Sequence, residues 1–197
     1  MLQDFLNIKL SELAKRQFII FERYDNLEES FPTDNPEQFI RSLDKYMLHV
    51  IEEVYEYYES NFIEGSEVID IFNYLLTILS ILYHLTDDVT LIDEIEFNDD
   101  KFRNTGDVNE ILHDINHKLI LLRRLFPERK WHTDETEAIT ERKISQMINL
   151  IVEAIHGIFL LCSNLEFLGI TDSVLISVSE SKIQKIMNKK DRKGISS

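Results

Sequence analysis

Apolar residues recur along most of this chain at intervals of three or four positions, which is the period of an amphipathic α-helix. A first helix is expected over Leu6–Tyr24, and a second from about Pro36 to Ser60. Pro36 suits a first helical turn, where its missing N–H costs nothing. The second segment carries one apolar stripe, which predicts that this face is buried. The stripe consists of Phe39, Leu43, Met47, Val50, Val54 and Tyr58.

The third expected helix follows a turn at Gly65, with Ser66 as its N-cap, and is apolar on nearly every side. A helix of this kind is buried, either in the core or at a subunit interface. An acidic stretch over 86–107 then breaks the pattern and predicts a loop. Asp107, with Glu110 three residues later, resembles the capping box of a fourth helix.

Two further helices complete the pattern. One is expected over roughly Thr133–Phe167, and the last begins near Thr171 and runs into a basic tail at about 182–197. The only strand-like stretches, "VTLIDEIEF" and "VLISVS", are ambiguous. We therefore expect an all-α bundle of five to six helices, forming a single domain over residues 1–197.

The formal net charge of −15 disfavours binding to nucleic acid or to an anionic membrane, and suits a site that concentrates divalent cations. The single cysteine, Cys162, lies in an apolar run, which predicts a reduced core residue. No uninterrupted apolar run reaches the roughly 18–20 residues of a membrane span. The N-terminus lacks the order of a signal peptide, so a cytoplasmic protein is expected.

Four acidic side chains occur as two pairs, at the end of the second expected helix and the start of the third. Glu53 and Glu56 are three residues apart, which places both on one side of a helix, and Glu67 and Asp70 repeat this spacing. In an antiparallel hairpin the two pairs would face each other and repel unless a cation lay between them. Such oxygen ligands suit Mg²⁺, with Mn²⁺ as the alternative. A solvated acidic face is the simpler interpretation of the same residues.

The segment "EEVYE", followed by "SEVIDIFNYLLTIL", resembles the ExxE…ExxD signature of the all-α nucleoside triphosphate pyrophosphatases. This superfamily groups the dimeric dUTPases with the MazG-type enzymes, and the short gap between Glu56 and Glu67 is nearer the MazG pattern. The resemblance implies a homodimeric enzyme that hydrolyses a nucleoside triphosphate to the monophosphate and pyrophosphate. The expected reaction is dUTP to dUMP, with dCTP, dATP, dGTP or a modified nucleotide as open alternatives.

The resemblance also implies roles for individual residues. The four acidic residues would bind Mg²⁺, and Glu53 would in addition orient or deprotonate the attacking water. Gln17 would read the pyrimidine, and Asn73 would lie near the sugar or base. Lys185 and Arg192 would close over the phosphates, although the Gln and Tyr of that family element are missing here. A solvated basic tail explains the same lysines and arginines equally well.

Two other functions fit parts of the chain. The fragment "LHDI" places His113 beside Asp114, as in HD-domain metal phosphohydrolases, with His84 as a further ligand. A non-enzymatic helical adaptor would instead use the apolar third helix to pack against a partner. The excess apolar surface of that helix is also an argument for a homodimer that does not depend on the resemblance.

Overall fold

Helices are the only regular elements in the described part of the chain. The computed structural model describes residues 10, 12–18, 36–62, 64–85, 107–126, 140–164 and 172–193. An N-terminal helical stretch covers residues 10 and 12–18. The bounded helices are α2 (Pro36–Glu59), α3 (Gly65–His84), α5 (Val108–Arg124), α6 (Glu141–Asn164) and α7 (Asp172–Lys193). The stretch "VLISVS" is helical within α7, while "VTLIDEIEF" lies outside the described residues.

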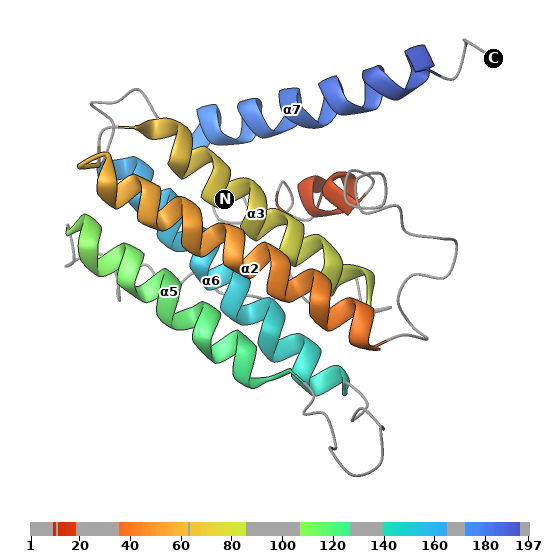
Figure 1. The fold of residues 1–197 in the computed structure, drawn as a ribbon, viewed down its shortest axis with the longest axis horizontal. Coiled ribbons are helices and arrows are strands. Elements are labelled where there is room, and N and C mark those ends of the chain that lie inside the picture. The colour runs from red at the N-terminus through yellow and green to blue at the C-terminus, as the bar shows by residue number, and fades with distance from the viewer. Residues whose placement is uncertain are drawn as a thin grey trace, which may run out of the picture.

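The helices form two hairpins that pack into a four-helix bundle. α2 packs mainly against α3, α5 packs against α6, and α3 also packs on α6 and so joins the two hairpins. Figure 1 shows these four helices side by side, with α7 crossing near the start of α3 and extending beyond the bundle. The predicted all-α bundle is therefore confirmed.

The third helix of the prediction, α3, lies at the centre of this bundle. Its side chains are buried almost all round, and the fully buried ones include Ile71, Phe72, Leu75, Leu76, Ile78, Leu79, Ile81 and Leu82. The argument for a dimer from excess apolar surface on this helix was therefore wrong, because helices of the same chain cover it. Among the described residues, the large exposed hydrophobic side chains lie on α2, α5 and α7, and are Leu48, Ile51, Tyr55, Ile120 and Val178. A homodimer stays a prediction from the resemblance.

Within the described part of the chain, two segments are long and apolar enough, by length and composition alone, to cross a membrane: Gly65–Tyr83 and Arg142–Cys162. Neither segment is an uninterrupted apolar run, because each contains isolated polar residues that a mean hydropathy tolerates. In each, 67% of the apolar window is buried inside the bundle. Burial of this extent is what the core helices of a water-soluble bundle also have, so the two segments are weak support for a membrane span. Cys162 is a buried core residue, as predicted.

The turn between α2 and α3 differs in detail from the prediction. α3 begins at Gly65 with Glu64 as its N-cap residue, while Ser66 lies within the helix and donates to Glu67 Oε1 at 3.2 Å. The left-handed backbone conformation falls at Asn61 (φ 54°) and Phe62 (φ 62°) rather than at a glycine. Asparagine adopts this conformation more readily than most residues, whereas phenylalanine needs support from its surroundings.

Aromatic packing supplies that support. The Phe62 ring packs edge-on against Tyr57 and Tyr58, with centroids 5.4 and 5.3 Å away. The Tyr57 hydroxyl also donates to the Phe62 carbonyl at 3.3 Å. Tyr57 is fully buried and Tyr58 only partly so, which corrects the apolar stripe predicted to end at Tyr58. This tight turn sets the register in which α2 faces α3.

Asp107 caps α5, as predicted. Its Oδ1 accepts a hydrogen bond from the Asn109 N–H at 2.8 Å, rather than from the Glu110 N–H of the predicted capping box. Asp107→Ala is expected to lower the free energy of unfolding by about 1 kcal/mol. Asp107→Asn should retain most of this stability, because the amide oxygen accepts the same bond. Urea denaturation measures both variants, and equal losses would contradict the capping role.

Candidate metal centre

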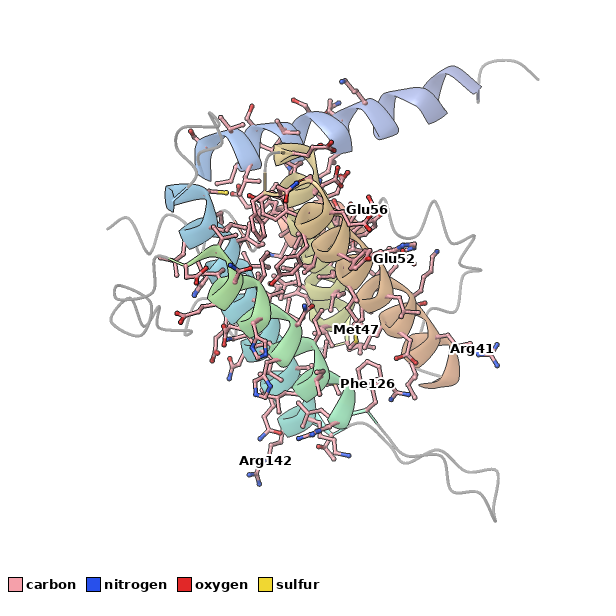
Figure 2. The ribbon with its side chains drawn as sticks, turned by 60° about the vertical axis from the view of Figure 1, so that its left-hand side comes forward. Arg41, Met47, Glu52, Glu56, Phe126 and Arg142 are labelled. Carbon is pink, nitrogen blue, oxygen red and sulfur yellow. The ribbon has the colours of Figure 1, made fainter. Side chains whose placement is uncertain are left out.

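The α2/α3 hairpin brings acidic side chains together close to its turn. One carboxylate oxygen from each of Glu53, Glu56 and Glu67 lies within 4.8 Å of the other two. We call these three residues the carboxylate cluster. Glu53 and Glu67 are partly buried, while Glu56 is exposed. Figure 2 shows Glu56 towards the end of α2. Three of the four predicted metal ligands are therefore neighbours in space.

The fourth predicted ligand, Asp70, borders the cluster. It follows Glu67 by about one turn of α3, lies outside the three-residue group and is partly buried. Its charge nevertheless helps to raise the pKa of Glu53. Its role as a metal ligand stays a prediction. Glu52 lies outside the cluster, and its Oε2 is 3.0 Å from Nδ1 of His49.

Electrostatics make the cluster a site that holds a proton when no cation is bound. The pKa of Glu53 is raised to about 8, first by burial and then by the hydrogen bond that it shares with Glu67. The charges of Asp70, Glu67 and Glu56 raise it further. At neutral pH Glu53 is therefore mostly protonated, which relieves the repulsion within the cluster. A divalent cation offsets the same repulsion and would compete with this proton.

Aromatic rings continue the same α2/α3 seam. Tyr74 packs one turn beyond Asp70, and its pKa is raised by burial and then by nearby carboxylates, Glu53 foremost. His49 stacks against it, one turn before Glu53. The sequence analysis assigned no role to either residue. The signal that could have found them is their four-residue spacing from Asp70 and Glu53, which places them on the same helix faces.

Gln17, the predicted base-reading residue, is buried with 8% of its surface exposed. Its Nε2 donates to Thr77 Oγ1 at 2.9 Å, and Thr77 in turn donates to the Asn73 carbonyl at 2.9 Å. Gln17 thus fastens the N-terminal helical stretch to α3. Reading a base would compete with this internal bond, and the role stays a prediction.

Asn73 is buried and hydrogen-bonded on both sides of its amide. Its Nδ2 donates to the Ile69 carbonyl, and its Oδ1 accepts from Ser179 Oγ, both at 2.8 Å. Because Ser179 is fully buried, this bond fixes α7 against α3. Asn73 therefore has a structural role here, and its predicted contact with a sugar or base stays a prediction.

The basic residues predicted to close over phosphates lie in the second half of α7. Lys185 is exposed, and the Arg192 side chain lies outside the described residues. This half of the helix extends beyond the bundle (Figure 1). The predicted closure over the phosphates stays a prediction.

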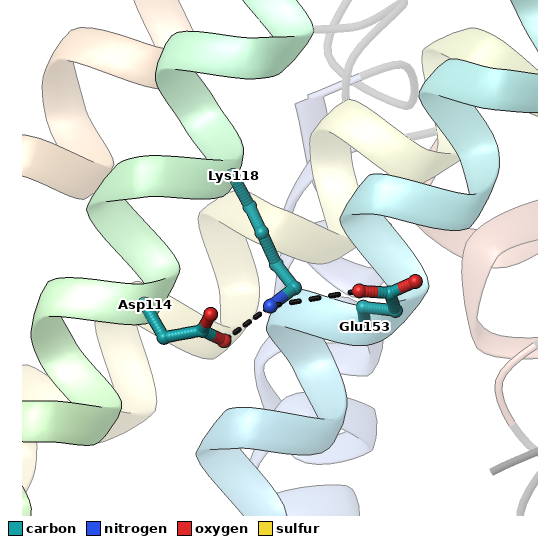
Figure 3. Close-up of polar contacts among 3 residues, drawn as sticks. All are labelled: Asp114, Lys118 and Glu153. Atoms are coloured by element: carbon teal, nitrogen blue, oxygen red, sulfur yellow. Dashed lines mark hydrogen bonds and ion pairs between the residues drawn. The ribbon is translucent and has the colours of Figure 1, made fainter. Parts of the chain in front are cut away.

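His113 and Asp114, the HD-type pair, are not part of any group of possible metal ligands among the described side chains. Asp114 forms an ion pair with Lys118, and Lys118 Nζ also lies 3.5 Å from Glu153 Oε2 of α6 (Figure 3). Lys118 is 3% exposed, so this is a buried cation between two carboxylates. In the described residues the carboxylate cluster is the one group of three or more His, Cys, Asp or Glu with ligand atoms this close. The His84 side chain lies outside them.

No protein-family model matches this chain, and neither a curated protein nor a solved structure is significantly similar to it. The relation to the all-α pyrophosphatases therefore rests on the two acidic motifs alone.

Proposed function

We propose that this protein is a divalent-cation-dependent nucleoside triphosphate pyrophosphohydrolase. It would cleave between the α- and β-phosphates, releasing a nucleoside monophosphate and pyrophosphate, with dUTP as the first substrate to test. The observation that carries the proposal is the meeting of Glu53, Glu56 and Glu67 across the hairpin. The resemblance of the two segments that hold these residues supplies the reaction type.

The donor set suits the proposed cofactor. Carboxylate oxygens are the hard ligands that Mg²⁺ and Mn²⁺ prefer, and three of them would leave coordination positions for water and phosphate. The crowding of the carboxylates also favours the proposal. Burial, followed by the hydrogen bond and charges of its acidic neighbours, raises the pKa of Glu53 to about 8, and a cation among these carboxylates would relieve their repulsion.

Each group would have a distinct task. A bound Mg²⁺ would neutralise phosphate charge and lower the pKa of a coordinated water. Glu53 would orient or deprotonate the attacking water once the cation has displaced its own proton. Glu56 and Glu67 would complete the ligand set from the two helices. The cation would also allow a chain of net charge −15 to bind a triphosphate.

A panel of ribo- and deoxynucleoside triphosphates with Mg²⁺ tests the proposal, with pyrophosphate and orthophosphate release measured separately. Pyrophosphate together with a monophosphate is the expected result, and EDTA should abolish it. Orthophosphate alone, or no turnover of any nucleotide, would contradict the proposal. A helical adaptor would show neither turnover nor thermal stabilisation by divalent cations.

Mn²⁺ binding is expected to strengthen with pH. Because the cation must displace the Glu53 proton, the apparent Kd should fall roughly tenfold per pH unit below about pH 8 and level off above it. Isothermal titration calorimetry of Mn²⁺ at a series of pH values measures this slope. A Kd that stays constant over the same range would contradict displacement of the proton.

Without the cation, the contribution of the same proton to stability has the opposite dependence on pH. The folded pKa of Glu53 is raised from 4.5 to about 8, so between these values the folded chain binds a proton that the unfolded chain has released. This contribution to stability is complete below about pH 4.5 and is lost as the pH rises through about 8.

A further inference from the structure

An aromatic cluster adjoins the carboxylate cluster on the same seam between α2 and α3. It consists of Tyr46 and His49 on α2 and Tyr74 on α3, with ring centroids 5.0 to 6.3 Å apart. His49 precedes Glu53 by four residues, and Tyr74 follows Asp70 by four. On both helices the rings therefore lie about one turn from an acidic residue and on the same face.

Neighbouring side chains hold the His49 ring in one orientation. It stacks on Tyr74 with 5.0 Å between centroids and 19° between planes, and its Nδ1 is 3.0 Å from Glu52 Oε2. Tyr46, which is buried, packs at its side. The His49 side chain still exposes 36% of its surface. Tyr74 covers one face of the ring, and the exposed remainder of the side chain is accessible to a ligand.

We propose that the outer face of His49 is the platform on which the base of a bound nucleotide stacks. The inference rests on the proposed function, since the phosphates would be held at the carboxylate cluster one turn away. A flat exposed ring beside a phosphate site matches a ligand in which a sugar joins a planar base to phosphates. The tilted Tyr46 and the stacked Tyr74 would hold the imidazole while the base packs on it.

The kind of contact determines the kind of selectivity. Every nucleobase has a π-face, so stacking distinguishes a nucleotide from inorganic polyphosphate but discriminates little between bases. Recognition of a base edge needs a polar side chain or backbone group beside the base, and Gln17, the residue predicted for this role, already donates from Nε2 to Thr77. The site would therefore accept several nucleoside triphosphates rather than dUTP alone.

Calorimetry in the presence of Mn²⁺ tests this with two ligands, α,β-imido-dUTP and inorganic tripolyphosphate. His49→Ala is expected to weaken nucleotide binding about tenfold, while Mn²⁺ and tripolyphosphate affinities stay within about twofold of wild type. His49→Phe should retain nucleotide affinity, because it keeps a stacking face. Leu48→Ala, at an exposed neighbour on α2, is the matched control and should change neither ligand.

The outcomes separate this inference from the proposed function. Wild-type affinity for the nucleotide in His49→Ala, or equal weakening of both ligands, would overturn stacking while leaving the phosphate site intact. A wild-type protein that binds neither ligand with Mn²⁺ would overturn the proposed function and the stacking together. Strong preference for one base among the four imido-deoxynucleotides would contradict the broad selectivity.

Discussion

Glu53→Gln is expected to lower kcat for nucleoside triphosphate hydrolysis by about 10²–10⁴-fold, the range typical of losing a general base. Glutamine preserves the shape of the side chain, but it neither accepts a proton nor provides an anionic metal ligand. Pyrophosphate release under saturating Mg²⁺ measures the effect. Glu59→Gln is the matched control, since Glu59 is an exposed carboxylate on the same helix and lies outside the carboxylate cluster.

The same variant should be more stable than wild type when no cation is present. At about pH 8 and above in EDTA, wild-type Glu53 ionises beside Glu67, Glu56 and Asp70, whereas glutamine removes that repulsion. A higher melting temperature in EDTA, together with loss of the stabilisation that Mg²⁺ gives to wild type, is the expected pair of results. Such an exchange of stability for function is typical of active sites. Retained turnover in Glu53→Gln, or equal loss in Glu59→Gln, would contradict the assignment.

Asp114→Asn is expected to lower the free energy of unfolding by about 3 kcal/mol, because it leaves the Lys118 ammonium buried without its nearer anion. Lys118 is 3% exposed and Asp114 26% exposed, so little solvent reaches this pair. Urea denaturation measures the loss. Turnover per folded molecule should be unchanged, whereas HD-type chemistry would require Asp114 for activity.

Two control variants separate the ion pair from general effects of substitution. Glu153→Gln should cost about 1 kcal/mol or less, since Glu153 is 47% exposed and its oxygen is 3.5 Å from the ammonium. Lys118→Met removes the buried charge while keeping an apolar chain, and should be far less damaging than Asp114→Asn. Equal losses in Asp114→Asn and Lys118→Met would contradict a role for the buried Lys118 charge. Burial, and secondarily the Lys118 charge, already lowers the pKa of the nearby His156 to about 3.

The helices were largely predictable because a helix that buries one face carries apolar residues at regular intervals along the sequence. The second helix was expected over Pro36–Ser60 and runs over Pro36–Glu59. The N-cap role of Asp107 was equally local. The prediction was wrong where two nearby residues could each take the N-cap position. At the start of α3 this position is occupied by Glu64, and Ser66 was expected there. There, packing of Phe62 against two tyrosines decides the path of the turn.

The candidate site was likewise predictable only where it depends on residues close together in the sequence. Spacing within each helix was enough to pair Glu53 with Glu56 and Glu67 with Asp70, because three residues make nearly one turn. How closely the pairs meet depends on the register of the hairpin, which the sequence pattern does not encode. The structure gathers Glu53, Glu56 and Glu67 and leaves Asp70 at the border. The stacking of His49 on Tyr74 likewise joins residues 25 positions apart in the chain.

By itself, the sequence determined an acidic, all-helical chain with two carboxylate pairs, since charge and periodicity are properties of neighbouring residues. The tertiary structure alone decided that α3 is covered within its own chain, and that the α5 carboxylate Asp114 is bound by Lys118. It also decided that the side-chain amides of Gln17 and Asn73 form hydrogen bonds inside the protein. The physical reason is that burial and hydrogen-bond pairing depend on which helices pack together, and residues far apart in the chain determine that packing.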